Sequence, residues 1–256
     1  MNTTSHKNGT VETTISGRSE SMLLYGIEAL ASSVKMPAPT ENSSEDLWHR
    51  LVSQVCVMGG ARGMEELARA ENADDFVAFK EATSLRKWSK VGFDEKYMAE
   101  VLRKASACRF PAKTAKKLRE MVVTPTIVQG TRVVLLKGLS ASMPREKLRT
   151  ALMTRCPRFR LKSASDFMIS THLSQDVIAL DTRVVGVFRD HLAFPLTASQ
   201  VQGNDAVYLS VESALRTVCE KAGITLARLD RLLFQLAGVS VIEFFLKKAL
   251  DKHKSV

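Results

Sequence analysis

Two ionisable residues stand out because of their types and their spacing. Lys162 lies at the start of an apolar-periodic stretch, "LKSASDFMIS", and Asp181, nineteen residues later, directly precedes a second, "TRVVGVFRDHL". A neutral lysine amine is a nucleophile, and a carboxylate can accept its proton or stabilise developing positive charge. The pair therefore contains the two functional groups, a nucleophilic amine and a carboxylate, that a covalent catalytic site needs.

The pattern around Lys162 predicts a helix that starts beside the lysine. Pro157 ends a preceding helix, and the small residues Ser163, Ala164 and Ser165 follow the lysine. The free amides and positive dipole end of such a helix favour a phosphate, and the same potential increases the fraction of neutral amine. The alternative is an ordinary lysine that forms a salt bridge or points to solvent.

Asp181 also has a structural interpretation. The segment "ALDTRVVGVF" is typical of an aspartate N-cap before an amphipathic helix, which contributes about 1 kcal/mol of local stability. A capping carboxylate is held rigidly, so it can still stabilise positive charge on a sugar. Local chemistry alone therefore leaves both interpretations of each residue open.

The positive charge of the chain is concentrated in one segment. The net charge is +10, but residues 100–162 hold 16 Lys and Arg against three acids, a balance of +13. Such a segment attracts polyanions and releases counterions from each phosphate that it neutralises. Solvated helix faces are the alternative, and no amphipathic helix with an aromatic apolar face supports a lipid surface.

Helical periodicity dominates the elements that must position these residues. We expect an all-α fold of about ten short helices in two lobes around a cleft, with a helix-hairpin-helix element at about 143–172. Residues 1–20 read as a disordered tail and 21–256 as one helical domain. Ser44 is expected to cap an early helix, and residues 124–142 allow short extended pieces without a clear hairpin. The expected helices cover about 21–34, 45–58, 62–70, 73–82, 94–106, 112–122, 143–155, 162–172, 182–192, 206–222, 225–236 and 240–252.

The cysteines and histidines argue against a metal or cofactor. Cys56, Cys108, Cys156 and Cys219 are too widely spaced for a zinc or iron–sulfur site, and the five histidines are equally scattered. We expect reduced thiols, no cofactor and no membrane span, in an intracellular protein that is a monomer.

Three stretches together resemble the helix-hairpin-helix DNA glycosylase superfamily, and most closely its archaeal-type 8-oxoguanine DNA glycosylase/AP lyase branch. "CRFPAKTAKKLREM" is similar to the family's Arg-Phe-x-x-(Arg/Lys)-x-Ala helix. "LKSASDFMIS…VIALDTRVV" is similar to its Lys-x-Ala-Ser-x-Phe-Leu…Ala-Ile-Leu-Asp pattern, and "AGITLARLDRLLFQLAG" to its C-terminal segment. The likeness spans about residues 45–238 in the family's order.

The resemblance implies a DNA base-excision repair enzyme that acts on damaged DNA. Lys162 would attack C1′ of a nucleoside with an oxidised purine such as 8-oxoguanine, expel the base and form a Schiff base whose β-elimination nicks the strand. Asp181 would accept the ammonium proton and stabilise oxocarbenium-like charge. The base would first be flipped into a pocket near Phe234 and Gln235. For Phe234, core packing is the alternative.

The departures from the family pattern lie just before Lys162 and in the base pocket. Arg158 and Arg160 replace the usual hairpin glycines, so guanidinium groups would hold phosphate in place of open amides. Arg183 stands where many relatives have His, and Phe234 where Trp is usual, with Gln235 after it. With Arg155 and Ser163, the arginines at 158, 160 and 183 are the expected DNA-binding residues.

Two other functional classes remain open. The double arginine in the hairpin is also consistent with a non-catalytic helical DNA-binding protein that retains the scaffold. A basic helical adaptor for RNA or protein fits the composition, but it leaves the pairing of Lys162 with Asp181 unexplained.

Overall fold

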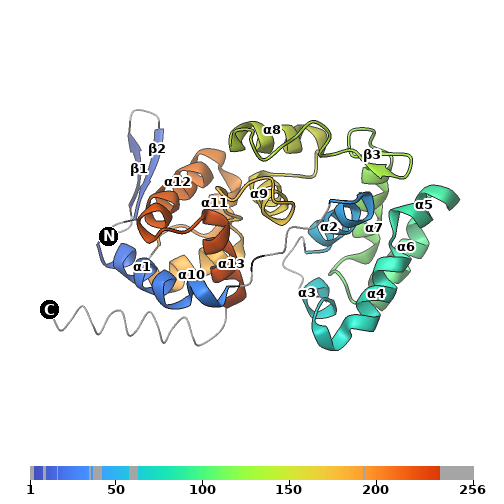
Figure 1. Cartoon of the computed structure of the whole chain (residues 1–256), viewed down its shortest axis with the longest axis horizontal. Helices are drawn as coiled ribbons and strands as arrows, with labels where there is room; N and C mark the ends of the chain where they lie inside the picture. Colours follow the sequence, from blue (N-terminus) through green and yellow to red (C-terminus); the bar gives the residue numbers. More distant parts are fainter. Residues whose placement is uncertain are drawn as a thin grey trace. The chain divides into compact units, whose positions relative to one another are not determined.

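The computed structural model describes residues 3–7, 10–15, 17–34, 36, 42–57, 63–192 and 194–236. The chain divides into two compact units, and each unit is built from segments that are not contiguous in the sequence. The first unit combines Met1–Ala38, Pro144–Arg149 and Arg160–Val256, and the second combines Pro39–Met143 and Thr150–Phe159. Helices dominate both units, which confirms the predicted all-α class (Figure 1). The cleft that we expect between two lobes stays a prediction.

The first unit contains the elements that carry Lys162 and Asp181. Its long helix α12 packs against α1, α11 and α13, and strand β2 lies beside it (Figure 1). The buried side chains of α12 include Val211 and Leu215, each at most 1% exposed, which places this helix in the core. The elements of this unit are β1 (Thr3–Lys7), β2 (Thr10–Thr14), α1 (Arg18–Leu30), η1 (Ala31–Ser33), α9 (Leu161–Ser170), α10 (Thr182–Leu192), α11 (Ala198–Gly203), α12 (Asp205–Ala222) and α13 (Leu226–Leu236).

The second unit packs its helices around α2. Trp48 of this helix is fully buried and donates its indole N–H to the Thr83 carbonyl oxygen at 2.7 Å. The elements of this unit are α2 (Ser44–Cys56), α3 (Gly63–Leu67), η2 (Ala70–Asn72), α4 (Ala73–Ala82), α5 (Leu85–Val91), α6 (Glu95–Lys104), α7 (Pro111–Val122), β3 (Val128–Gln129) and β4 (Arg132–Val133). Helix α8 (Arg145–Arg155) contributes residues to both units.

Most predicted helices form within a few residues of their expected bounds, but two short helices were not predicted. Helix α5 is capped by Ser84, whose hydroxyl accepts the Lys87 N–H at 3.2 Å. Helix α11 begins with a Thr197–Gln200 capping box, a signal that the sequence contained. No described helix has the length and apolar character of a membrane span. The expected helix over 240–252 lies outside the described residues.

The predicted cap of α2 was wrong by one residue. Ser43 is the N-cap, because its hydroxyl accepts the Asp46 N–H at 3.1 Å. The Ser44 hydroxyl instead accepts the Val133 N–H at 3.2 Å and so fastens β4 to the start of α2.

Two antiparallel hairpins form in segments without a clear strand pattern in the sequence. β1 and β2 pair with Thr3 opposite Thr14, within the segment 1–20 for which the sequence predicts a disordered tail. Alternating Thr, Val and Glu in "TVETT" favours this extended conformation. In the second unit, β3 and β4 pair across a turn in which Gly130 has φ of 60°, a conformation that suits glycine.

The chain reverses between α8 and α9 without glycine. Pro157 and Arg158 form a turn that is closed by the Phe159 N–H, which donates to the Cys156 carbonyl oxygen at 2.8 Å. Arg160 has an extended φ of −120°. Among the described non-glycine residues only Ser106 and His172 have positive φ, so neither arginine is strained. A turn therefore forms here with arginines at positions 158 and 160.

Candidate lysine–aspartate site

Lys162 lies in the first turn of α9 and faces a carboxylate of its own helix. Its Nζ is 3.7 Å from Oδ2 of Asp166, one helical turn further along, and both side chains are partly exposed, at 25% and 18%. Residues four apart lie on the same helix face, so this contact follows from local geometry. Lys162 therefore forms a salt bridge, its partner is Asp166, and its role as a nucleophile stays a prediction.

The carboxylate of Asp166 is shared with an arginine from α13. Arg231 Nη2 donates to Asp166 Oδ1 at 2.9 Å, so Arg231 and Lys162 contact different oxygens of the same group. Arg231 Nη1 lies 3.8 Å from Oδ2 of Asp230, which is only 2% exposed. Asp181 also acts electrostatically on this guanidinium. Asp166, Asp230 and Arg231 thus form one charged cluster, and Lys162 contacts it through Asp166.

Asp230 is the buried member of this cluster. Its Oδ1 accepts the Ala179 N–H at 2.8 Å, which ties α13 to the extended segment before Asp181. Burial, together with the charges of Asp166 and Asp181, raises the pKa of Asp230 to about 7 against the opposing effects of Arg231 and the Ala179 N–H. The carboxyl of Asp230 therefore changes its charge near neutral pH.

Asp181 is the N-cap of α10, as predicted. Its Oδ1 accepts the backbone N–H of Arg183 at 2.9 Å and that of Val184 at 2.8 Å, and its carbonyl oxygen accepts the Val185 N–H at 3.0 Å. Two bonds to one oxygen fix the plane of the carboxylate. The other oxygen, Oδ2, is not used by this cap.

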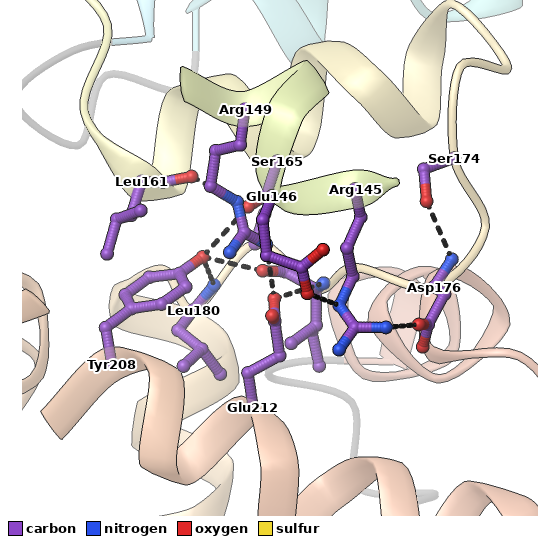
Figure 2. A network of polar contacts seen from close by, with 12 residues as sticks. Arg145, Glu146, Arg149, Leu161, Ser165, Ser174, Asp176, Leu180, Tyr208 and Glu212 are labelled. Carbon is purple, nitrogen blue, oxygen red and sulfur yellow. Dashed lines mark hydrogen bonds and ion pairs between the residues drawn. The ribbon is translucent and has the colours of Figure 1, made fainter. Parts of the chain in front are cut away.

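A tyrosine positions the segment that leads to Asp181. Figure 2 shows the Tyr208 hydroxyl, from α12, directed at Leu180 and Ser165. The hydroxyl donates to the Ile178 carbonyl oxygen at 2.6 Å and accepts the Leu180 N–H at 3.2 Å. Ser165 Oγ of α9 lies 3.4 Å from it and donates its own proton to Leu161. The fully buried Tyr208 therefore links the helix of Lys162 to the segment of Asp181.

Ion pairs surround this tyrosine and hold the start of α8 against α12. Arg149 and Glu212 form a buried pair at 2.6 Å, with side chains 4% and 2% exposed (Figure 2). Arg216 bonds to both Glu212 and Asp176, and Arg145 also pairs with Asp176. Removing one partner of a buried pair leaves an uncompensated charge, so this network fixes the scaffold beneath the site.

Arg183 and Phe234 form a stacked pair between α10 and α13. The guanidinium carbon of Arg183 lies 4.3 Å from the centroid of the Phe234 ring, within the range of a cation–π contact. Phe234 is half-buried and lies three residues after Arg231, on the same side of α13. Gln235 is in the same helix, and its side chain lies outside the described residues.

The other predicted DNA-binding residues do not share one environment. Ser163 Oγ accepts the Arg160 N–H at 2.9 Å, so this amide at the start of α9 is occupied, while the Arg160 side chain is exposed. In the second unit, Arg158 pairs with Glu120, and Arg155 donates to the carbonyl oxygens of Leu135 and Lys137 at 2.8 Å. Arg155 thus has a structural role there.

Sequence reasoning missed Asp166 and the two residues of α13. The spacing of Lys162 and Asp166 by four was a readable signal of a salt bridge on a helix. Arg231 lies 65 residues after Asp166 in the sequence, and Asp230 directly precedes Arg231. No local pattern connects either residue to Lys162.

Three crystal structures share this fold. The 8-oxoguanine DNA glycosylase of Thermotoga maritima aligns with a TM-score of 0.50 and 20% identity over 86% of this chain and 88% of that chain. The Methanocaldococcus jannaschii 8-oxoguanine glycosylase/lyase, in complex with DNA containing 8-oxoguanine, aligns with a TM-score of 0.54 and 17% identity over 84% and 96%. A second structure, of the 8-oxoguanine DNA glycosylase from that organism, gives 0.53 and 17% over 86% and 92%.

Comparison of the sequence alone assigns the chain to no protein family. No protein-family model matches the chain, and no curated protein matches it significantly. The structural likeness nevertheless defines the fold, which is that of the 8-oxoguanine DNA glycosylases.

Proposed function

We propose that this chain is a DNA glycosylase with AP lyase activity that removes an oxidised purine such as 8-oxoguanine. The observation that supports the proposal is the contact of the Lys162 amine with Asp166 in the charged cluster around Arg231, on a fold like that of the 8-oxoguanine DNA glycosylases. The neutral amine of Lys162 attacks C1′ of the damaged nucleoside, and the base leaves. The resulting Schiff base undergoes β-elimination, which cuts the strand.

The geometry supports a division of work between two carboxylates. Asp166 lies 3.7 Å from the Lys162 amine, so we assign to Asp166, rather than Asp181, the proton that the ammonium must lose. Arg231 donates to the other oxygen of Asp166 and so holds this carboxylate in place beside the amine. Asp181, with its plane fixed by two backbone N–H groups, stabilises the positive charge that develops on the sugar.

The damaged base must rotate out of the DNA duplex before Lys162 can reach the sugar, because base stacking in the duplex makes C1′ inaccessible. We place the flipped base beside Phe234 and Gln235. The Arg183 guanidinium covers one face of the Phe234 ring. A base can therefore stack on this ring only if Arg183 moves away or if the base uses the opposite face. Stacking against an aromatic ring contributes about 1–3 kcal/mol per base.

Damaged DNA is the partner that the charge distribution supports. The segment 100–162 carries a balance of +13, and the exposed Arg160 directly precedes the helix of Lys162. Arg158 is also exposed, and its bond to Glu120 must be exchanged for a phosphate if it is to bind DNA. The monomeric state and the intracellular location stay predictions.

A non-catalytic DNA-binding protein is the second candidate. One observation favours it: the Lys162 amine is engaged in an ion pair with Asp166 of its own helix, as expected of a lysine with a structural role. This candidate predicts salt-dependent DNA binding without strand cleavage and without preference for a lesion.

Borohydride trapping separates the two candidates. Reduction of a mixture of the protein with DNA containing 8-oxoguanine or an abasic site should leave a covalent adduct, and Lys162→Gln should abolish it. Lys221→Gln is the matched control, because Lys221 is an exposed lysine of the same unit that pairs with Glu20. Absence of an adduct with the unaltered protein, or an undiminished adduct with Lys162→Gln, would overturn the proposal.

A further inference from the structure

The segment that leads to Asp181 is buried although it has no regular secondary structure. Ile178, Ala179 and Leu180 are at most 5% exposed, and they belong to neither a helix nor a strand. A buried backbone N–H or carbonyl group without a partner costs free energy, so such a segment needs partners from elsewhere in the fold. Side chains from three helices supply them: Gln202 of α11, Tyr208 and Glu212 of α12, and Asp230 of α13.

The peptide group that joins Leu180 to Asp181 is held on both sides. Its carbonyl oxygen accepts an N–H of the Gln202 side chain, with Nε2 at 2.9 Å. Its N–H, which is that of Asp181, donates to the Ala179 carbonyl oxygen at 2.6 Å. A peptide group is planar, so two bonds on opposite sides oppose its rotation about the chain. Because this group is bonded directly to Cα of Asp181, its orientation sets the direction in which the chain enters α10.

Gln202 acts closer to Asp181 along the chain than the other three side chains do. The bonds of Tyr208, Glu212 and Asp230 all lie one or more peptide groups earlier. Gln202 is also exposed, so a substitution there removes a hydrogen bond without opening a cavity in the core. The contribution of Gln202 can therefore be tested by itself.

Helix α11 gives Gln202 a fixed support. At the start of the helix, the Thr197 hydroxyl accepts the Gln200 N–H at 3.3 Å, and the Gln200 side chain accepts the Thr197 N–H at 2.8 Å. Val201, next to Gln202, is fully buried. Asn204, directly after the helix, caps α12 with its side chain. The backbone that carries Gln202 is therefore fixed at both ends of α11.

We propose that Gln202 is a positioning residue for Asp181, an inference that rests on the proposed function. The two bonds from Arg183 and Val184 fix the Asp181 carboxylate relative to α10. The bond from Gln202 fixes the backbone from which this carboxylate projects. Together they hold the carboxylate where it stabilises the positive charge on the sugar, and a misplacement of about 1 Å costs a factor of about 10² in rate.

Amide exchange in the free protein tests the hold on Asp181. Gln202→Met removes the N–H donor but keeps a side chain of similar length, so the peptide group before Asp181 can rotate and the cap of α10 opens more often. Exchange of the Arg183 and Val184 amide hydrogens, followed by NMR, should accelerate by about 10-fold, while amides in the middle of α12 retain their rates. Unchanged exchange at Arg183 and Val184 would overturn the proposal, and so would an equal acceleration throughout the first unit, which indicates a general loss of stability.

A second glutamine supplies the matched control. Nε2 of Gln129 also donates to a backbone carbonyl oxygen, that of Pro125 at 3.2 Å, but it does so in the second unit. Gln129→Met should therefore leave the exchange of the Arg183 and Val184 amides unchanged.

The trapping reaction tests the consequence for chemistry. With saturating protein, borohydride trapping on abasic DNA should be about 10-fold slower in Gln202→Met, while the affinity for DNA with a reduced abasic site stays the same. Gln202→Lys restores an N–H donor of similar reach and should recover most of the rate. An adduct that forms at the unaltered rate in Gln202→Met would overturn the positioning role alone. No adduct from the unaltered protein would overturn the proposed function, and the inference with it.

Discussion

The Lys162 amine lies 3.7 Å from a carboxylate oxygen of Asp166, its neighbour one turn along α9. Asp181, the carboxylate expected from the sequence, uses one oxygen to cap α10 through two backbone N–H groups. The two carboxylates are therefore not equivalent, because one contacts the amine and the other is fixed to the backbone. On this difference rests our proposal that Asp166 accepts the proton and Asp181 stabilises the charge.

Asp166→Asn should slow the trapping reaction while it leaves DNA binding intact. The amide retains the shape of the side chain but cannot accept the lysine proton, so we expect the rate of borohydride trapping to fall by about 10²-fold at neutral pH. Affinity for DNA with a reduced abasic site, measured by fluorescence anisotropy, should change little. Asp190→Asn is the control, since Asp190 is exposed and pairs with the adjacent Arg189. An unchanged rate in Asp166→Asn would return the role of proton acceptor to Asp181.

Tyr208→Phe should destabilise the first unit and disturb the position of Asp181. The substitution removes a hydroxyl that bonds to Ile178 and Leu180 and leaves the Leu180 N–H, a buried donor, without this partner. We expect a loss of about 1–3 kcal/mol in the free energy of unfolding, measured by urea denaturation. Tyr97→Phe, at an exposed tyrosine of α6, should cost much less. Equal effects of the two substitutions would contradict the linking role of Tyr208.

The sequence was sufficient for features that depend on local patterns. The apolar period and the capping aspartate located α9, α10 and the cap at Asp181, because these features arise within a few residues. The contact of Arg231 with Asp166 joins residues 65 apart, and the buried pair of Arg149 and Glu212 joins residues 63 apart. Such contacts depend on how helices pack, which no local pattern encodes.

The irregular segments also have physical explanations. The N-terminal hairpin gains its order from strand β2 packing on α12, a contact that the polar composition of the tail does not indicate. The turn before Lys162 forms with ordinary backbone angles at Arg160, so the missing glycines do not prevent it. Composition therefore predicted the class of the fold more reliably than its irregular segments.

Phe234→Leu should weaken discrimination between damaged and undamaged DNA. Leucine preserves an apolar side chain but removes the aromatic face that Arg183 now covers at 4.3 Å and on which we place the base. We expect the preference for 8-oxoguanine DNA over guanine DNA to fall by about 10-fold, with an unchanged dependence of affinity on salt. Phe76→Leu is the matched control, because Phe76 is a half-buried ring beneath Lys80 in the other unit. If both variants lose discrimination equally, Phe234 has no specific part in base recognition.

Asp230→Asn should alter how stability depends on pH. Burial raises the pKa of Asp230 to about 7 in the folded chain, whereas an aspartate in an unfolded chain titrates at about 4. Between these values the folded protein retains a proton that the unfolded chain has released. The contribution of Asp230 to the free energy of unfolding therefore falls as the pH rises from about 4 to about 7, and it stays low above that range.

Asparagine retains an oxygen that can accept the Ala179 N–H, but it does not titrate. The variant therefore lacks the fall in unfolding free energy that Asp230 causes as the pH rises. The difference in unfolding free energy between Asp230→Asn and the unaltered protein should move in favour of the variant by about 2 kcal/mol between pH 5 and pH 8. Urea denaturation at the two pH values measures it, with Asp190→Asn as the control at an exposed aspartate. A difference that is the same at pH 5 and pH 8 would show that Asp230 does not titrate in this range, and it would remove the neutral carboxyl from the cluster around Arg231.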